Sequence, residues 1–287
     1  NVDRARIGFG HITLDNLEFS FNNGLDEINI KELQIGWNTI EFLKSWFEPQ
    51  KGITEIKIID PVLTIGSESG AHETQDEHFS ERRDQIVKQF ENATGQLMGQ
   101  FKNVVRVEIS KGTIKYKNLD GEMHMVAKDF QGELEKNSSV TATLGISAKL
   151  LTNENDNLKI TANLNLENYD IIADVLVDDY DLNEGLPEFV TNAILFKSGK
   201  LNGRIQVVKS SSMDEIDYSV NGSIRVDDAS YVLSNVPEME FKNANLTVNI
   251  KQDLLTIETF TQDYYDGRIE VIGTIKNIIA PELNLSS

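Results

Sequence analysis

The sequence contains no cysteine and no long apolar run, and each absence excludes a class of protein. The lack of Cys among 287 residues excludes disulfides, thiolate zinc sites, iron–sulfur clusters and thiol nucleophiles, and it suits an oxidising compartment. No apolar stretch reaches the ~18 residues that a membrane-spanning helix needs. The sequence starts at Asn1 rather than Met, so we expect any targeting signal or membrane anchor to lie upstream.

Positive charge is also scarce. The 27 Lys and Arg residues are outnumbered by 46 Asp and Glu residues, so the formal net charge is −19. Such a surface repels phosphates, which excludes nucleic acids and anionic membrane faces as electrostatic partners. A composition of 39% hydrophobic and 25% charged residues is typical of a globular protein with a sizeable core.

Most of the sequence alternates between apolar and polar residues with a period of two, which indicates β-strands. About fourteen segments follow this pattern, at the spacing of hairpins and meanders rather than of βαβ units. The dipeptides Asn23-Gly24, Asp120-Gly121 and Asp266-Gly267 supply residues that tolerate the positive φ of tight hairpin turns. Antiparallel neighbours are therefore expected.

A few segments have helical patterns instead. Asn38 and Glu41 form a capping box at the start of an apolar segment, which predicts a helix over 38–47. Apolar residues at helical spacing predict a helix over 79–101, and a weaker pattern after a proline predicts one over 187–196. The expected fold is mainly β, with two or three short helices.

The expected organisation is one continuous sheet with a helical insertion. An N-terminal β segment spans 1–70, the insertion spans 71–103, and the sheet continues over 104–287. A one-sided strand must have its apolar face covered by another sheet, by helices or by a ligand. The same rows fit either a long antiparallel meander curled into an open apolar groove or a closed sandwich or solenoid, and periodicity does not separate these.

No motif predicts a metal or cofactor site. His72, Glu73, Glu77 and His78 are close in sequence, but the two histidines are not at the i, i+4 spacing of a helical metal site, so a polar linker is the better interpretation. The segment 8–10 (Gly-Phe-Gly) is half of a dinucleotide fingerprint, but a strand pattern rather than a helix follows it. We expect no cofactor.

Catalysis is not predicted either. The acidic stretches Asp178-Asp179-Tyr180-Asp181 and Asp227-Asp228 lack the spacing of a calcium loop and are interpreted as turn carboxylates at strand ends. No pair of acids is marked out for glycoside hydrolysis. With no Cys and four His, nucleophile–base pairs have few members available. The sequence favours a protein that is not an enzyme.

Several segments in a fixed order resemble one protein family. A strand and short aromatic helix over 35–47 precede a strand with a proline step over 56–65, and VEISKGTIKY follows at 107–116. The segment SGKLNGRI at 198–205 and the segment DGRIEVIGTI at 266–275 are similar to the C-terminal signatures of the family. Together these motifs resemble the AsmA-like superfamily of bacterial envelope proteins, which includes TamB and YhdP and is akin to the repeating-β-groove lipid-transfer proteins.

The resemblance implies a protein of the cell envelope. Members are anchored in the inner membrane, span the periplasm and shield lipid acyl chains in an apolar groove, in phospholipid transport and outer-membrane biogenesis. The expected partners are a phospholipid or other acyl lipid and envelope proteins, with membrane contact through parts of the parent chain outside this segment. An acidic rim favours recognition of acyl chains over phosphate headgroups.

The candidate groove-lining residues are apolar members of the alternating rows. They are Ile56, Ile58, Val105, Val107, Ile109, Ile114, Tyr116, Leu164, Leu166, Val220, Ile224, Ile269 and Val271. One alternative function is a structural or adhesive module that binds proteins by strand addition at an open edge. Another is a polysaccharide-active β-solenoid enzyme, which requires exposed carboxylates beside aromatic platforms.

Overall fold

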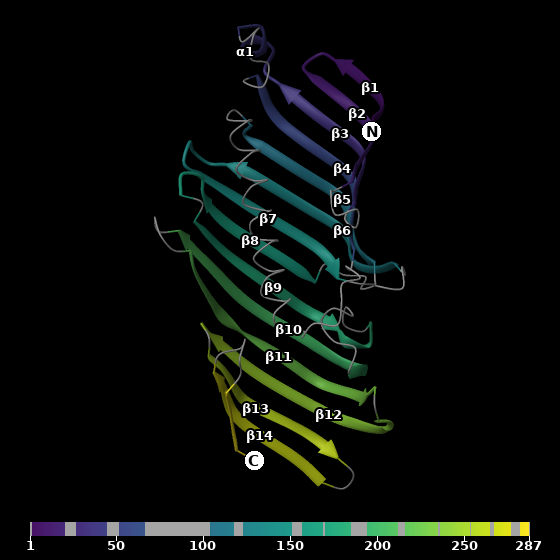
Figure 1. Cartoon of the computed structure of the whole chain (residues 1–287), viewed down its shortest axis with the longest axis vertical. Helices are drawn as coiled ribbons and strands as arrows, with labels where there is room; N and C mark the ends of the chain where they lie inside the picture. The colour runs from purple at the N-terminus through teal and green to yellow at the C-terminus, as the bar shows by residue number, and fades with distance from the viewer. Residues whose placement is uncertain are drawn as a thin grey trace. The chain divides into compact units, whose positions relative to one another are not determined.

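The computed structural model describes residues 2–20, 27–44, 52–66, 104–117, 123–150, 157–168, 170–184, 194–211, 216–234, 236–252, 254–264, 267–276 and 282–286. In these residues, fifteen strands follow one another in chain order in one sheet (Figure 1). The sheet is mostly antiparallel and open, and it does not close on itself. The expected mainly β meander is therefore confirmed, whereas a closed sandwich is not what the described strands form.

The strand bounds are β1 (Val2–Gly8), β2 (His11–Ser20), β3 (Glu27–Trp37), β4 (Ile53–Gly66), β5 (Arg106–Lys117), β6 (Met123–Lys136), β7 (Thr141–Leu150), β8 (Leu158–Asn165), β9 (Ile171–Asp181), β10 (Ile194–Ser211), β11 (Ile216–Leu233), β12 (Val236–Lys251), β13 (Leu254–Tyr264), β14 (Gly267–Lys276) and β15 (Glu282–Ser286). The described helices are α1 (Thr39–Lys44) and the 3-10 helix η2 (Leu182–Glu184).

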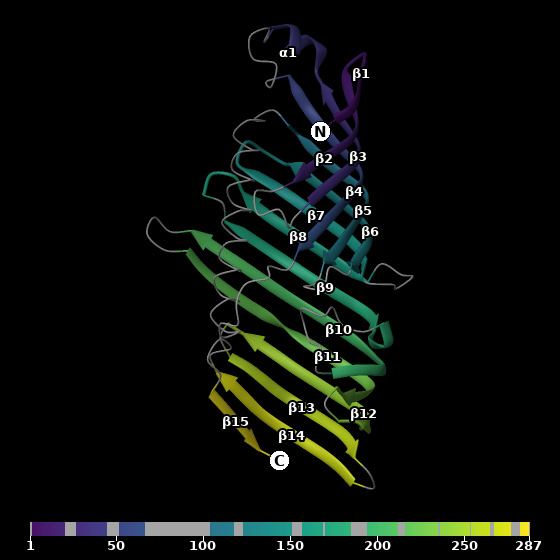
Figure 2. The same cartoon turned by 45° about the vertical axis from the view of Figure 1, so that its right-hand side comes forward.

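The chain divides into two compact units. Unit 1 comprises Asn1–Met125 and Asp129–Ala142, and unit 2 comprises Val126–Lys128 and Thr143–Ser287. Strands β1 to β5 thus belong to unit 1, and β8 to β15 belong to unit 2. Within unit 2, β9 to β12 lie side by side in both views (Figures 1 and 2). The division falls within β6 and β7, and each unit is considered by itself below.

The pair β4–β5 departs from the antiparallel order. Ile56 lies opposite Val107 and Ile58 opposite Ile109, and both strands run in the same direction. A parallel neighbour requires a connection that returns the chain to the starting end of the strand, and residues 67–105 separate these two strands. The expectation of an antiparallel meander is therefore corrected at this pair, next to the sequence that was expected to be an insertion.

Single residues in a left-handed conformation interrupt many of the strands. Positive φ angles of 49° to 58° occur within strands at Asn16, Asp60, Lys111, Asp129, Asp179, Asp228 and Asn243. Nearly all are Asn or Asp, which tolerate this region better than other non-glycine residues. Side-chain chemistry therefore decides where these strands bend, and we call each such position a kink.

Each kink shifts the apolar alternation by one residue. Before Asp228, the apolar residues of β11 that share a face are even-numbered, as at Val220 and Val226; after it they are odd-numbered, as at Ala229 and Tyr231. An extra residue in a strand has this effect because side chains otherwise alternate strictly between faces. The kink thus keeps apolar side chains on one face while the strand changes direction.

Asparagine side chains on neighbouring strands satisfy the backbone at two kinks. The N–H of Asp179 donates to Asn202 Oδ1 at 2.9 Å, and the N–H of Asp228 donates to Asn245 Oδ1 at 3.0 Å. A kinked residue leaves the regular ladder, and its N–H then needs another acceptor. The asparagines supply that acceptor.

Replacement of Asn245 by Ala should therefore destabilise unit 2. The Asp228 N–H would lose its acceptor, and we expect the free energy of unfolding to fall by about 1 kcal/mol. Urea denaturation measures this change. Asn249→Ala is the control, because Asn249 bonds only an exposed Glu258 side chain; an equal loss in both variants would contradict the role of Asn245.

The helical expectations have different outcomes. Helix α1 is capped as expected, because Asn38 Oδ1 accepts hydrogen bonds from the N–H groups of Ile40 at 3.0 Å and Glu41 at 3.2 Å. The helix expected over 79–101 lies outside the described residues, as do the turns at 23–24 and 120–121. The prediction of a helix over 187–196 is wrong at its C-terminal end, since Phe196 belongs to β10 and pairs with Tyr231. Strand pairing outweighs a weak helical pattern there.

Candidate apolar-ligand surface

Apolar residues of neighbouring strands, three of them glycines, lie in register across unit 2. One row, from β9 to β14, consists of Val175, Ile205, Gly222, Ile250, Leu255 and Ile275. A second row consists of Val177, Gly203, Ile224, Val248, Ile257 and Gly273. Directly opposed residues share a face of the sheet. The rows therefore form one continuous apolar surface, which we call the inner face of unit 2; the opposite side is the outer face.

The inner face becomes more tightly packed, and then aromatic, at the kinks. Tyr180, Leu182, Ala229 and Ala244 form a buried cluster, each at most 4% exposed. Beyond the cluster, the Tyr231 ring stacks on Phe241 with centroids 5.1 Å apart and lies 5.9 Å from Phe196. The inner face thus joins an aliphatic wall to an aromatic wall.

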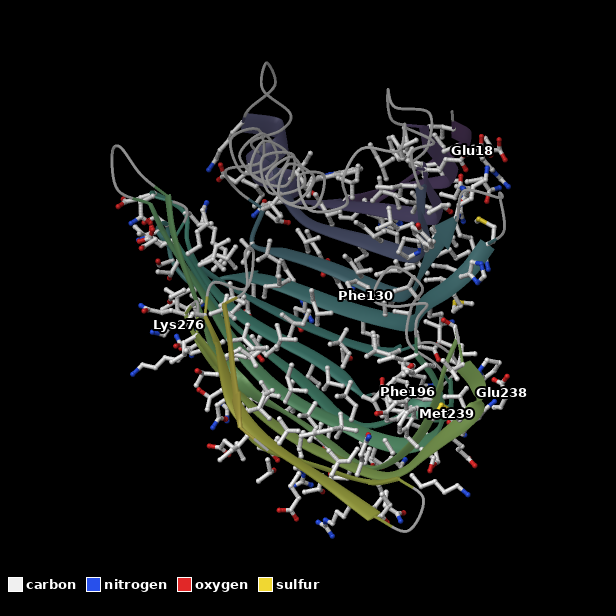
Figure 3. The ribbon with its side chains drawn as sticks, turned by 60° about the horizontal axis from the view of Figure 1, so that its bottom comes forward. Glu18, Phe130, Phe196, Glu238, Met239 and Lys276 are labelled. Carbon is white, nitrogen blue, oxygen red and sulfur yellow. The ribbon has the colours of Figure 1, made fainter. Side chains whose placement is uncertain are left out.

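The ribbon of unit 2 curves around these side chains. Figure 3 shows Phe196 and Met239 on the inner side of the ribbon, and Glu238 and Lys276 projecting from the outer side. Glu238 and Met239 are adjacent in sequence, so the pleat alone sends them to opposite faces. The division between apolar and charged faces is therefore encoded residue by residue.

The inner face of unit 2 is only partly covered. All members of the two rows except Val248 keep part of their surface exposed. Extensive contacts between the described elements join sheet neighbours, or η2 and β10. Among the described residues, no element forms a second layer over these rows. A one-sided apolar sheet without a second layer leaves hydrophobic surface for something else to cover.

Unit 1 repeats the arrangement with several of the predicted site residues. Ile56 and Ile58 of β4 lie opposite Val107 and Ile109 of β5, and Leu63 lies opposite Ile114. Beyond Ile114, Ile65 lies opposite Tyr116. The sequence-predicted residues of β4 and β5 are thus brought together in register, on the inner face of unit 1.

In unit 2 the predicted site residues that belong to strands fall on the inner face, with differing exposure. Val220 lies opposite Val207, and Ile224 opposite Gly203. Val271 lies opposite Phe260, whereas Ile269, which is 38% exposed, lies opposite Gln262. Leu164 is buried and pairs with Ile171.

Two predicted site residues lie outside the strands. Val105 precedes β5 and is 51% exposed, while its neighbour Val104 is buried. Leu166 lies in the turn after β8. The alternation in sequence extends one or two residues past the paired strand in each case. The predicted rows therefore end sooner than the sequence pattern suggests.

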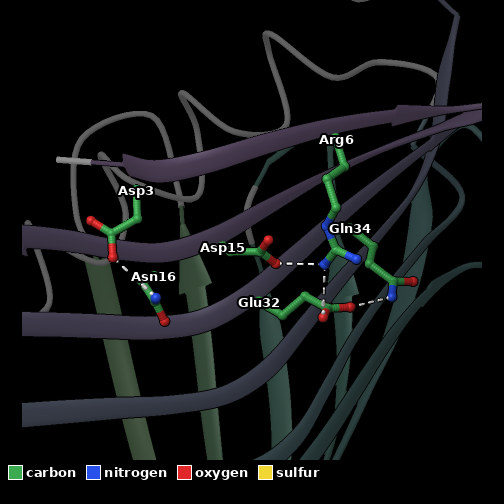
Figure 4. Close-up of polar contacts among 6 residues, drawn as sticks. All are labelled: Asp3, Arg6, Asp15, Asn16, Glu32 and Gln34. Carbon is green, nitrogen blue, oxygen red and sulfur yellow. Dashed lines mark hydrogen bonds and ion pairs between the residues drawn. The ribbon is translucent and has the colours of Figure 1, made fainter.

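The ion pairs of the described strands lie on the outer faces. In unit 1, Arg6 contacts Asp15 at 2.6 Å and Glu32 at 3.5 Å, and Gln34 donates to Glu32 (Figure 4). The hydrogen bond to Asp15 raises the pKa of Arg6, and the charge of Glu55 raises the pKa of Lys57. In unit 2 the outer face carries pairs between neighbouring strands and within single strands: Lys200–Asp179, Lys200–Asp181, Arg204–Asp174, Arg225–Asp227, Lys242–Glu240 and Arg268–Glu270.

Two polar residues of the inner face were missed by sequence reasoning. Gln262 and Lys209 are each 5% exposed. They follow Phe260 and Val207 by two residues on the same strands, so they point to the same face as these apolar residues. Gln262 Oε1 accepts a hydrogen bond from the Tyr231 hydroxyl at 2.5 Å, and burial raises the pKa of Tyr231. Their signal in the sequence is a polar residue at a position where the alternation calls for an apolar one.

The acidic stretches have a second structural role besides the one expected. Asp181 ends β9, and its Oδ1 accepts a hydrogen bond from the Asn183 N–H at 3.3 Å, as expected of a turn carboxylate at a strand end. Asp228 lies in the middle of β11 and Asp179 near the end of β9, and both are kinks. The interpretation of Asp227-Asp228 as a turn at a strand end is therefore wrong, because the chain bends there without reversing. The segment 8–10 contains the turn between β1 and β2, with Gly10 at φ 80°.

Neither a metal cluster nor a membrane-spanning helix occurs in the part of the chain that the structure describes. His72, Glu73, Glu77 and His78 lie outside that part. No family model and no curated protein matches the sequence. Among the described residues, the inner face is the feature from which we infer a function.

Proposed function

We propose that this protein is a non-enzymatic module of cell-envelope biogenesis that shields or conducts phospholipid acyl chains along its inner face. The observation that carries the proposal is the apolar surface spanning six strands of unit 2, over which no element among the described residues forms a second layer. The likeness of several segments to AsmA-like proteins supports a location in the periplasm, between the inner and outer membranes. Burying the inner face against acyl chains would remove apolar surface from water on both sides.

The dimensions of the rows suit an acyl chain. Six strands spaced ~4.8 Å apart give a row of about 24 Å. One leaflet of a bilayer contributes about 15 Å of hydrocarbon, half of a ~30 Å core. A whole chain could therefore lie across the strands, gaining about 0.8 kcal/mol for each buried methylene.

The distribution of charge favours recognition through the chain rather than the headgroup. The sequence has a net charge of −19, and an acidic surface repels phosphate. The described ion pairs lie on the outer faces, so they leave the inner-face rows free of such pairs. Hydrocarbon can slide between equivalent apolar rows, which is what a conduit requires.

Site-specific photo-crosslinking tests the proposal. A photoreactive residue at Val220, on the inner face, should capture lipid from membranes, whereas one at Asn221 should not, because Asn221 faces the opposite side. Mass spectrometry of the adducts and of lipids extracted from the purified protein measures the outcome. Lipid absent from both the extract and the Val220 adducts would overturn the proposed function, and equal capture at the two positions would argue against the inner face.

A further inference from the structure

The inner face of unit 2 carries an amide with an unused hydrogen-bonding group. Gln262 is 5% exposed, and its Oε1 accepts the Tyr231 hydroxyl at 2.5 Å. Its Nε2 has no hydrogen-bond partner among the described residues. The Nε2 also keeps some solvent accessibility. Among the described residues, Asn157 Nδ2 is the one side-chain nitrogen or oxygen that is fully buried without a hydrogen-bond partner. Two N–H donors of Gln262 therefore remain available to a ligand.

The position of Gln262 places these donors among the apolar rows. Gln262 follows Phe260 by two residues on β13, and Phe260 packs against the buried cluster at the kinks. The register places Gln262 between the pairs Lys242–Asp263 and Asn245–Thr261, beside the stretch of β12 that contains Ala244. Because Ala244 is small and 4% exposed, it leaves space in which Tyr231 of β11 and Gln262 of β13 meet across the intervening strand.

The surroundings favour an uncharged acceptor. Tyr231 stacks on Phe241, and burial raises the pKa of its hydroxyl, which indicates a poorly hydrated environment. Unsatisfied donors in such an environment carry a desolvation cost that an acceptor would relieve. A carbonyl oxygen is far easier to desolvate than a phosphate, and the neighbouring Asp263 on the outer face, which binds Asn243, adds negative charge nearby.

We propose that Gln262, oriented by Tyr231, donates a hydrogen bond to an ester carbonyl of the lipid whose acyl chain lies along the inner face of unit 2. This inference rests on the proposed acyl-binding function and adds the polar group that is recognised. The hydrogen bond would place the ester linkage beside the aromatic wall and direct the hydrocarbon toward the aliphatic rows. The protein would thereby distinguish ester lipids from hydrocarbon of the same length.

The test compares two phospholipids that differ only in these carbonyls. The full chain is titrated with diacyl phosphatidylcholine and with its dialkyl ether analogue of equal chain length, and the two affinities are expressed as a ratio. We expect the wild-type protein to prefer the ester lipid by about threefold to tenfold, the factor of one neutral hydrogen bond. Gln262→Met should reduce the ratio to about one.

Two further variants distinguish loss of the ester site from loss of the folded structure. The double variant Tyr231→Phe with Gln262→Met removes both polar groups and so leaves no unpaired hydroxyl; it should also show no preference. Gln206→Leu, which replaces a glutamine that bonds Asp174 on the outer face, should keep the wild-type ratio. Equal binding of the two lipids by the wild-type protein, or an unchanged ratio in Gln262→Met, would overturn the ester site alone. Failure of the wild-type protein to bind either lipid would overturn the acyl-binding function together with it.

Discussion

Replacing Ile224 by Asp is expected to abolish acyl-chain binding by unit 2 while the protein still folds. Ile224 lies in the middle of an inner-face row, between Gly203 and Val248, and is only half-buried. A ligand that covers an ionised carboxylate must remove it from water, at a cost of several kcal/mol. Since ~1.4 kcal/mol is tenfold in affinity, we expect at least a hundredfold loss.

The folded state should tolerate this change better than the ligand does. Ile224 has no second layer packed on it among the described residues, so an aspartate there remains hydrated until a ligand arrives. We expect the free energy of unfolding to fall by about 1 to 3 kcal/mol, the usual range for a single substitution. Circular dichroism and denaturant titration measure the stability, and lipid co-purification measures the binding.

Ser223→Asp provides the matched control. Ser223 is adjacent in sequence, is exposed on the outer face and lies opposite Arg204, so the new carboxylate stays in water near a positive charge. Its lipid binding should equal that of the wild-type protein. Retention of lipid by the Ile224 variant, or the same loss in the Ser223 variant, would show that the inner face does not hold the ligand.

The division into two faces could be predicted from the sequence because the pleat of a strand is local. Ile56 and Ile58 alternate with polar neighbours whatever strand lies beside them, and the structure places both on the inner face of unit 1. The partner of that strand was not predictable in the same way. The parallel pairing of β4 with β5 depends on how the chain returns, and alternation contains no information on direction.

The kinks show why the conformational preference of a residue can be predicted correctly while its place in the fold is not. Asp and Asn favour turns because they tolerate positive φ, and this preference predicts a turn at Asp227-Asp228. The same property lets Asp228 bend a strand that continues to Leu233. A shift of apolar parity on the two sides of an Asp or Asn, without a change of chain direction, is the sequence signal that distinguishes a kink from a turn.

Gln262 marks the limit of pattern-based prediction at the candidate site. A polar residue at an inner-face position could have been noticed, since Phe260 and Gln262 share parity. Its partner could not, because Tyr231 lies 31 residues earlier on a strand that is not adjacent to β13. The pairing of these side chains across β12 depends on the small size of Ala244 and on the register of three strands.

The second large effect is expected at Gly199, in β10, where no other residue fits. Its φ is 128°, and a Cβ atom built there would lie 2.7 Å from Ala229 Cα and 2.8 Å from Ala229 Cβ. The backbone conformation alone costs a non-glycine residue about 1 to 3 kcal/mol. Overpacking adds about 1 to 3 kcal/mol, so Gly199→Ala should lower the free energy of unfolding by about 2 to 6 kcal/mol.

Gly203 on the same strand separates this effect from a general need for glycine. A Cβ at Gly203 would meet Ser223 O at 3.7 Å and Ile224 at 3.8 Å, which are ordinary contacts, and its φ is not in the left-handed region. Gly203→Ala should therefore cost less than about 1 kcal/mol. Urea denaturation of the two variants, side by side, measures the difference. Equal losses of stability would contradict the importance of the close approach of β10 to Ala229. A large loss confined to the Gly199 variant would show that the inner face beside the kink at Asp228 depends on backbone contact between β10 and β11.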